Sequence, residues 1–299
     1  MSGYSIHYLE QLTGIKAHTM RVWEQRYKLI TPTRSQTNIR SYSDADLKKL
    51  LNISTLLNAG LRIGDISRLT NDDLYKKVSL LQKRKTDVPV LYAAAINAFI
   101  AAAMTYDESA FTKQYKQCIT RYGMEYTYEH ILHPMLVRIG TLWKVNKLNP
   151  AQEHFLTNLI RQKMFAGINE LKIPASTSTW VLFLPEHEEH EIGLLYANFM
   201  FRFYGVKTIY LGQRVPLDTL SEVVESVKPA GLFYFQVSQI KPHYTATIIN
   251  ALDKRFKNLP IVICTGQEAV KGLKLPNNIE HISNPSSFLN WLKQKAHHA

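Results

Sequence analysis

The stretch Pro185-Glu-His-Glu-Glu-His-Glu-Ile-Gly193 decides how this chain is interpreted. It follows a β-type run at residues 179–184 and precedes an apolar helical pattern. We expect a polar loop at the carboxyl end of a strand, which is where open α/β sheets hold their ligand groups. Within it, Glu188-x-His190-x-x-Gly193 offers a carboxylate, an imidazole and a glycine at which the backbone can approach another group. A metal-ligating imidazole needs an acceptor for its other ring nitrogen, and the nearby carboxylate can supply one.

Three interpretations of this loop compete. A charged, solvated loop is the most frequent origin of an isolated Glu/His cluster. A zinc hydrolase site is disfavoured because His187 and His190 are spaced i, i+3, whereas that motif needs i, i+4. Finally, Glu188-x-His190-x-x-Gly193 resembles the Asp-x-His-x-x-Gly signature of cobalamin-binding domains, with glutamate in place of aspartate. That resemblance implies that His190 is the lower axial ligand to cobalt.

Length and composition indicate a soluble protein of two or three domains. The chain has 299 residues, of which 45% are hydrophobic and 20% charged. No apolar run reaches the roughly eighteen residues of a membrane span. The N-terminus lacks the basic and apolar segments of a secretion signal, so we expect a cytoplasmic protein with no membrane partner. Cys118 and Cys264 stand in apolar surroundings and are expected to be buried thiols.

Positive charge is concentrated near the N-terminus. The net charge is +12, and residues 1–87 hold 15 Lys/Arg against 8 Asp/Glu, leaving 21 against 16 for the remainder. A basic excess in the first third of the chain predicts a nucleic-acid-binding module joined to something else.

Residues 5–27 have the pattern of a helix-turn-helix. Ser5 can cap a helix that buries apolar residues to position 13, and Gly14 suits a tight turn. A second helix then runs from about 17 to 27, burying either Val22 or Trp23. In this arrangement the second helix enters the major groove of DNA. Its polar candidates for DNA contact are His18, Thr19, Arg21 and Arg26.

A segment without acidic residues, 31–43, follows and predicts a two-stranded wing. Arg34, Arg40 and Tyr42 are placed to meet phosphates. Ser43-x-x-Asp46 then predicts a capping box at the start of another helix.

Together these motifs resemble the mercury-resistance-regulator (MerR) class of winged helix-turn-helix proteins. The resemblance rests on Thr19-x-Arg21-x-Trp23-Glu24-x-Arg26-Tyr27, the Arg-Ser-Tyr-Ser segment 40–43 and the Leu-x-x-Gly-Leu spacing of 57–61, and it covers about residues 4–75. It implies a homo-oligomer, a dimer or tetramer, on an inverted repeat of double-stranded DNA. We therefore predict a DNA-binding domain at 1–75 and a basic linker at 76–88.

Residues 89–172 are helical in pattern throughout and predict an antiparallel four-helix bundle. One spacing in this segment resembles the helical cap of cobalamin photoreceptor regulators, the CarH/LitR group. Trp143 is followed, after nine intervening residues, by Glu153-His154. The resemblance implies that Trp143, Glu153 and His154 contact the upper side of the cofactor. Lys144 departs from the pattern, because the light-sensing relatives have a histidine there that can bind the vacated cobalt face.

Residues 178–299 alternate strand and helix, which predicts a doubly wound, flavodoxin-like parallel sheet. Two further positions match the cobalamin-domain pattern. Ser238-x-Ile240 follows the third strand, and Thr265-Gly266 follows the fourth, where the family has two glycines. By this resemblance, Ser238, Thr265 and Gly266 line the slot for the nucleotide tail of the cofactor, and Thr265 reduces its volume.

The fold class predicted for the whole chain is therefore multidomain, α and α/β. The leading function is a cobalamin-dependent transcriptional repressor controlled by adenosylcobalamin and light, with methylcobalamin as the alternative cofactor. The alternative is a MerR-type regulator whose degenerate sensor does not bind cobalamin. A corrinoid enzyme is disfavoured because the chain has no room for a substrate-binding barrel, so we predict no enzymatic activity.

Overall fold

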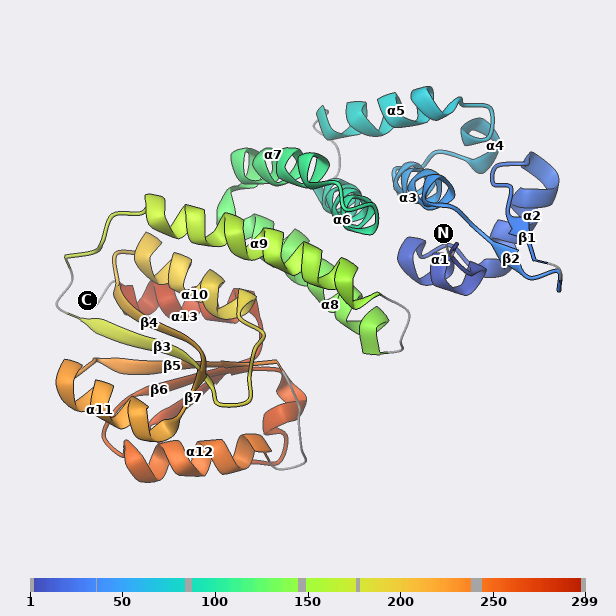
Figure 1. Cartoon of the computed structure of the whole chain (residues 1–299). Helices are drawn as coiled ribbons and strands as arrows, with labels where there is room; N and C mark the ends of the chain where they lie inside the picture. The colour runs from blue at the N-terminus through green and yellow to red at the C-terminus, as the bar shows by residue number, and fades with distance from the viewer. Residues whose placement is uncertain are drawn as a thin grey trace. The chain divides into compact units, whose positions relative to one another are not determined.

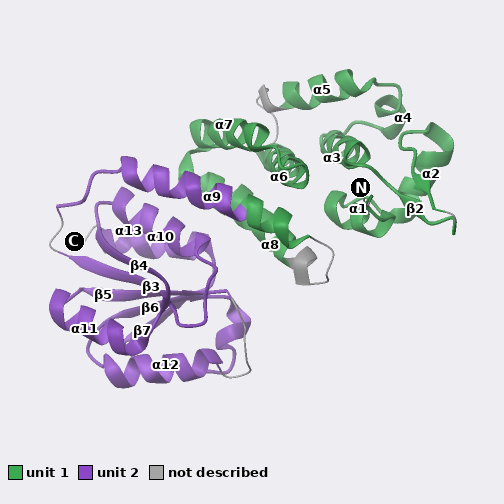
Figure 2. Cartoon of the chain, viewed as in Figure 1, with its two compact units in different colours: residues 1–156 green, residues 157–299 purple. Residues whose placement is uncertain are grey.

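A computed structural model of the chain describes residues 3–35, 37–83, 88–144, 149–175, 178–237 and 244–296, without the side chains of 82, 83 and 141–144. The chain forms two compact units, Met1–Leu156 and Thr157–Ala299 (Figure 2). Helix α9 (Pro150–Glu170) contributes to both units.

The first unit begins with the predicted helix-turn-helix, α1 (Ile6–Thr13) and α2 (Ala17–Tyr27). The Ser5 hydroxyl accepts a hydrogen bond from the Tyr8 N–H, and Gly14 ends α1 with a φ of 73°. The helical pattern allowed either Val22 or Trp23 to face the core. Trp23 is the buried residue, and Val22 is 50% exposed.

A wing and three helices follow. Strands β1 (Thr33–Arg34) and β2 (Arg40–Ser41) pair antiparallel, as predicted. The predicted capping box opens α3 (Asp44–Asn58), with both of its hydrogen bonds present between Ser43 and Asp46. After the short α4 (Ile63–Ile66), α5 (Asn71–Lys83) runs through most of the segment predicted as a linker, which is therefore helical over residues 76–83.

The remaining helices of this unit are α6 (Val88–Met104), α7 (Glu108–Thr127), the π-helix η1 (Tyr128–Leu132) and α8 (His133–Lys144). Helix α7 is kinked at Gly123, which has a φ of 74° and a ψ of 174°. The first turns of α9 pack here as well: the Gln152 side chain donates to the Met104 carbonyl at 3.0 Å, and the rings of Tyr106 and Phe155 meet edge to face.

The second unit is the predicted doubly wound sheet. Its five parallel strands lie in the order β4-β3-β5-β6-β7. The strands are β3 (Thr179–Pro185), β4 (Lys207–Val215), β5 (Gly231–Gln236), β6 (Ile261–Thr265) and β7 (Ile279–Ile282). Helices α10 (Ile192–Phe203) and α13 (Pro285–Ala296) cover one face, and α11 (Leu217–Val227) and α12 (Tyr244–Arg255) cover the other (Figure 1). A short 3₁₀ helix, η2 (Gln267–Val270), follows β6.

Alternate residues of the central strands fill two cores. Trp180 and Phe233 pack against Phe201 of α10 and Trp291 of α13. The side chains that face α11 and α12 form the other core, which includes Val181, Phe183, Leu220, Leu232, Tyr234, Ile249 and Leu252. Strands buried on both faces are expected to read as continuous apolar runs, as residues 179–184 do.

In the described part of the chain, no helix is both long and apolar enough to cross a membrane. The Cys118 thiol is buried and Cys264 is half-buried.

Candidate functional site

The loop that carries His190 connects β3 to α10 at the point where the strand order reverses. From β3 the chain first adds β4 on one side and later β5 on the other. Open α/β sheets bind their ligands at such a reversal point, beyond the carboxyl ends of the strands. Sheet topology alone thus places residues 186–191 at the position expected for a ligand site.

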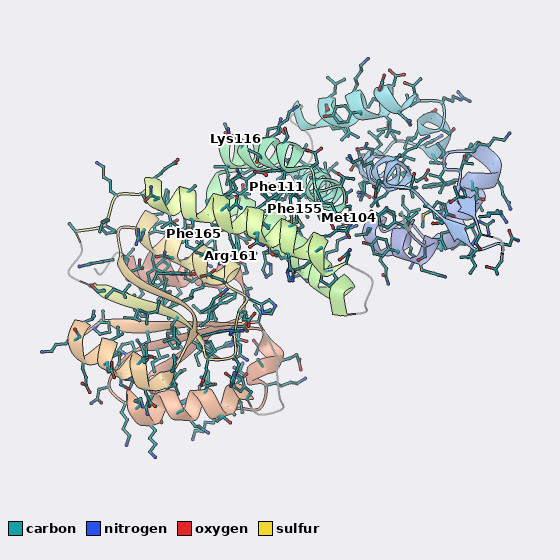
Figure 3. The ribbon with its side chains drawn as sticks, viewed as in Figure 1. Met104, Phe111, Lys116, Phe155, Arg161 and Phe165 are labelled. Atoms are coloured by element: carbon teal, nitrogen blue, oxygen red, sulfur yellow. The ribbon has the colours of Figure 1, made fainter. Side chains whose placement is uncertain are left out.

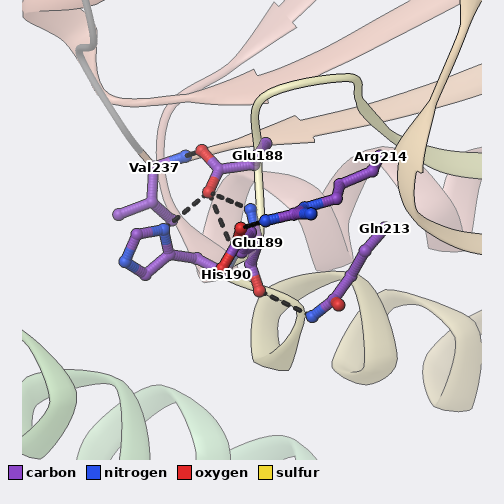
Figure 4. A network of polar contacts seen from close by, with 6 residues as sticks. All are labelled: Glu188, Glu189, His190, Gln213, Arg214 and Val237. Atoms are coloured by element: carbon purple, nitrogen blue, oxygen red, sulfur yellow. Dashed lines mark hydrogen bonds and ion pairs between the residues drawn. The ribbon is translucent and has the colours of Figure 1, made fainter.

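Glu188 organises this loop (Figure 4). Its side chain is 1% exposed, and Oε1 accepts hydrogen bonds from the backbone N–H groups of Glu189 and His190, both at 2.9 Å. The same oxygen lies 2.6 Å from Nδ1 of His190, and Oε2 accepts from the Val237 N–H at 2.8 Å. Because Val237 directly follows β5, one buried carboxylate joins the loop after β3 to the end of β5.

The Glu188 contact determines which ring nitrogen of His190 can act as a ligand. An ionised carboxylate only accepts hydrogen bonds, so Nδ1 carries the proton and Nε2 carries the lone pair. The imidazole is 59% exposed although its partner is buried. An oriented and largely exposed imidazole, which in its neutral form presents Nε2, is the donor that a cobalt ion requires, so this part of the site fits the predicted cofactor.

A second carboxylate, Glu191, anchors the other end of the loop, and the sequence motif gave no indication of it. Glu191 is buried and accepts from Nε of Arg161 in α9 at 2.9 Å (Arg161 is labelled in Figure 3). The Tyr210 hydroxyl donates to the same carboxylate at 2.8 Å, and burial together with this bond raises the pKa of Tyr210. No local pattern could have identified this role of Glu191, because its partners lie 30 and 19 positions away.

Gly193 packs against the side chain of Phe235. A Cβ atom added at Gly193 would overlap that aromatic ring, so the glycine is required by contact with β5. Thr265 is buried and Gly266 has open space around it. Ser238 lies outside the described residues. The Phe235 ring therefore fills the space beside Gly193.

The predicted upper-side residues belong to the other unit. The side chain of Trp143 lies outside the described residues, as does that of Lys144. Glu153 and His154 form a pair, with Oε2 of Glu153 2.7 Å from Nδ1 of His154, and the imidazole is 70% exposed. Two more histidines, His130 and His133, lie in η1 and α8 of the same unit. His130 stacks on Tyr92 at 4.9 Å, and burial lowers the pKa of His133.

The predicted DNA-contacting side chains of α2 lie at its surface. His18, Arg21 and Arg26 are exposed and Thr19 is half-buried. Arg26 also lies over the ring of Tyr27, 5.3 Å from its centroid. The opposite side of α2 is held in the core by Met20 and Trp23, so the helix presents its polar side chains outward.

In the wing, Glu24 of α2 gathers three of the predicted residues. Arg40 donates from Nε to Glu24 at 3.1 Å, and Arg34 forms an ion pair with the same carboxylate at 3.6 Å. Tyr42 is only 1% exposed, and its hydroxyl donates to Glu24. The prediction that Tyr42 meets phosphates is therefore wrong, because its ring belongs to the core and fixes the wing to α2.

The described residues contain no group of three or more His, Cys, Asp or Glu side chains that could hold a metal ion. A cavity of about 800 Å³ lies at the amino ends of the strands, where Trp180, Glu280 and Trp291 contribute to its lining. None of the predicted site residues lines that cavity, and the geometry around His190 identifies the site better than cavity size does.

Family models identify two modules in the chain. Residues 4–73 match the MerR HTH family regulatory protein model, and residues 95–166 match the B12 binding domain model. The chain is thus a MerR-type transcriptional regulator that carries a B12-binding domain.

Two curated relatives from Myxococcus xanthus span most of this chain. It is 26% identical over 228 residues to the HTH-type transcriptional repressor CarH, covering 76% of each chain. It is 22% identical to the HTH-type transcriptional repressor CarA, covering 86% of this chain and 85% of that one. Among solved structures, a monomethylamine corrinoid protein from Methanosarcina barkeri matches with a TM-score of 0.53 and 11% identity, over 66% of this chain and 96% of that one, which supports the fold alone.

Proposed function

We propose that this protein is a repressor whose operator binding is controlled by adenosylcobalamin and by light. The observation that carries the proposal is the Glu188–His190 pair at the reversal point of the sheet, in a chain that also has a MerR-type head and a B12-binding module. Both curated relatives that span most of the chain are repressors by name. We assign no enzymatic reaction to it.

His190 would hold cobalt through Nε2, with Glu188 fixing the tautomer and the ring orientation. Trp143, Glu153 and His154 would contact the upper side, a role that rests on the resemblance of their spacing. When bound, adenosylcobalamin supplies a cobalt–carbon bond that visible light can break. Methylcobalamin is the alternative cofactor.

Regulation requires that ligand binding favours one arrangement of the chain over another. The loop of residues 186–191 is joined to β5 by Glu188 and to α9 by Glu191 and Arg161. Since Glu153 and His154 lie near the start of α9, the helix that holds two of the predicted upper-side residues also carries Arg161, which binds the loop of His190. We propose that this connection lets the cofactor state select the assembly state, a dimer or tetramer on an inverted repeat.

A second candidate is a regulator whose sensor does not bind cobalamin. The observation that favours it is the Phe235 ring beside Gly193, together with Thr265 at the position of a family glycine. Under this alternative, Glu188 and Glu191 serve only to hold the loops of the sheet together.

Absorbance spectroscopy tests the proposal. Purified protein is incubated with adenosylcobalamin in the dark, desalted, and compared with a His190→Ala variant and with a His187→Ala control from the same loop. We expect the wild type and the control to retain a spectrum shifted from that of the free cofactor, whereas His190→Ala does not. A wild-type protein that emerges colourless refutes the proposal and supports the second candidate. Size-exclusion chromatography before and after illumination then tests control by light.

A further inference from the structure

A half-buried arginine on α8, Arg138, is hydrogen-bonded to the helix-turn-helix. Nη1 of Arg138 donates to Oδ1 of Asn97 in α6 at 3.2 Å, and Nη2 donates to the carbonyl of Leu12 in α1. Asn97 in turn donates from Nδ2 to the Thr55 hydroxyl of α3 at 3.2 Å. One side chain of the bundle is thus hydrogen-bonded, directly or through Asn97, to two helices of the DNA-binding head, which we define as residues 3–75.

The carbonyl that Arg138 contacts is at the C-terminus of α1. The last carbonyls of a helix have no partner within the helix and carry its negative end, where a cation is stabilising. Helix α1 has no basic residue in its last turn, and the neighbouring Thr13 carbonyl accepts from Ser54 of α3 at 2.9 Å. Arg138 therefore supplies, from the bundle, the cationic cap that α1 lacks.

Among the described residues, no carboxylate pairs with Arg138, and partial burial lowers the pKa of its guanidinium. Removing an unpaired charge from water, even in part, costs free energy, and the two oxygens that it contacts offset only part of that cost. Such a residue is expected to serve a purpose other than stability.

The surroundings of Arg138 leave hydrogen-bonding groups unmatched. A cavity of about 520 Å³ is lined by residues of both the head and the bundle, including Lys16, Trp23 and Arg138. The Gln11 side chain also lines it, and its buried Oε1 has no hydrogen-bond partner among the described residues. A guanidinium has five N–H donors, and two bonds to carbonyl oxygens do not exhaust them. Unmatched donors and acceptors around a cavity favour a second arrangement of the same groups.

Helix α8 also carries a predicted cofactor contact. Trp143, the predicted cofactor contact, lies five residues after Arg138 in the same helix, which is about 7.5 Å along its axis at 1.5 Å per residue. Beyond Leu12, the turn at Gly14–Lys16 sets the direction of α2. A displacement of α8 would therefore move the group that holds the end of α1 and, through the turn, the recognition helix.

We propose that Arg138 is a positioning residue that transmits the cofactor state of the sensor to the recognition helix by holding the C-terminus of α1. The inference rests on the proposed function, because it requires that α8 responds to cobalamin. The proposed coupling between the sensor and the recognition helix acts within one chain and is distinct from any effect of assembly on operator binding.

Hydrogen–deuterium exchange tests this inference on the full-length protein. Amide exchange is measured with and without adenosylcobalamin in the dark, for wild type, Arg138→Gln, and a Lys116→Gln control that removes the same charge from an exposed site of α7 (Lys116 is labelled in Figure 3). We expect cobalamin to slow exchange in α1 and α2 of the wild type and the control by about fivefold or more, the lower end of typical coupling between sites. In Arg138→Gln this response should be lost, while amides of α10 remain protected by the cofactor.

Each outcome decides a separate question. If α10 of the wild type does not respond to cobalamin, the proposed function fails. If α10 responds and the head of Arg138→Gln responds as the wild type does, the inference is wrong and the proposed function stands. Faster head exchange in the variant, with no cofactor response in the wild-type head, would reduce Arg138 to a stabilising cap and also overturn it.

Two further variants keep the test decisive. Arg138→Lys retains the charge but cannot contact Asn97 and Leu12 together, so a partial response is expected. Should Arg138→Gln fail to fold, Asn97→Ala removes the link to α3 and leaves the cap in place, and it is expected to weaken the head response. A full wild-type response in Asn97→Ala would contradict the route through Asn97.

Discussion

Nδ1 of His190 lies 2.6 Å from Oε1 of Glu188, in a pair whose carboxylate is 1% exposed and whose imidazole is 59% exposed. Burial of the acceptor removes water as a competitor, so the ring is held in one orientation with Nε2 directed away from its partner. The buried Glu188 carboxylate therefore orients a His190 imidazole that is largely exposed.

Replacing Glu188 with glutamine should weaken cobalamin binding by about 10- to 100-fold, the usual effect of removing the partner of a ligating histidine. The amide cannot accept every hydrogen bond that the two carboxylate oxygens now accept. Titration of absorbance against cobalamin concentration measures the change. Glu186→Gln, an exposed substitution in the same loop, serves as the control. Equal affinities for Glu188→Gln and wild type would show that Glu188 does not orient the ligand.

Gly193→Ala should lower the free energy of unfolding by about 1–3 kcal/mol, the usual cost of overpacking a core. The cause is overlap of the new methyl group with the Phe235 ring. Phe235→Leu on the Gly193→Ala background should restore most of the loss, which denaturant unfolding of the four proteins measures as a double-mutant cycle. Additive effects of the two substitutions would argue against this contact.

The single variant Phe235→Leu also separates the two candidate functions. If the Phe235 ring limits access for the nucleotide tail, a smaller side chain should increase the affinity for cobalamin. If the sensor has lost the cofactor altogether, Phe235→Leu should remain as colourless as the wild type. The absorbance titration described above distinguishes these outcomes.

Illuminated protein loaded with adenosylcobalamin should lack a persistent second nitrogen ligand on cobalt. Lys144 stands where the resemblance has a histidine, and a lysine with a pKa near its usual value of about 10.4 has no lone pair to donate at neutral pH. Lys144→His should create such an adduct, visible as a change in the absorbance spectrum that persists in the dark. A stable adduct in the wild type would point to His130, His133 or His154 as the ligand.

DNA binding should depend on Arg21 and not on the hydroxyl of Tyr42. Arg21→Gln should weaken operator binding and reduce the slope of log affinity against log salt by about 1 for each lost phosphate contact. Tyr42→Phe should leave that slope unchanged, because the ring is buried and its hydroxyl contacts Glu24. Fluorescence anisotropy at several salt concentrations measures both. A reduced slope for Tyr42→Phe would return Tyr42 to the phosphate contacts.

Local patterns in the sequence were sufficient to predict the helix-turn-helix, the wing, the capping box at Ser43 and the alternation of strands and helices in the last third. Each depends on residues close in sequence, through helical periodicity, side-chain caps or buried apolar runs. The same is true of Glu188 and His190, which are two residues apart and so meet in almost any turn. These features could be predicted because the interactions that produce them join residues close together in the sequence.

Contacts between distant residues could be decided only by the tertiary structure. Tyr42 looked like a phosphate ligand until Glu24 and the core were seen around it, and Gly193 owes its identity to Phe235, 42 positions later. Arg161 joins Glu191 across 30 positions, and Arg138 reaches Leu12 across 126. Such pairs have no periodic pattern, because their spacing depends on how whole elements pack. The sequence by itself determined the modules and the ligand loop, whereas folding determined which side chains hold that loop and which one links the bundle to the head.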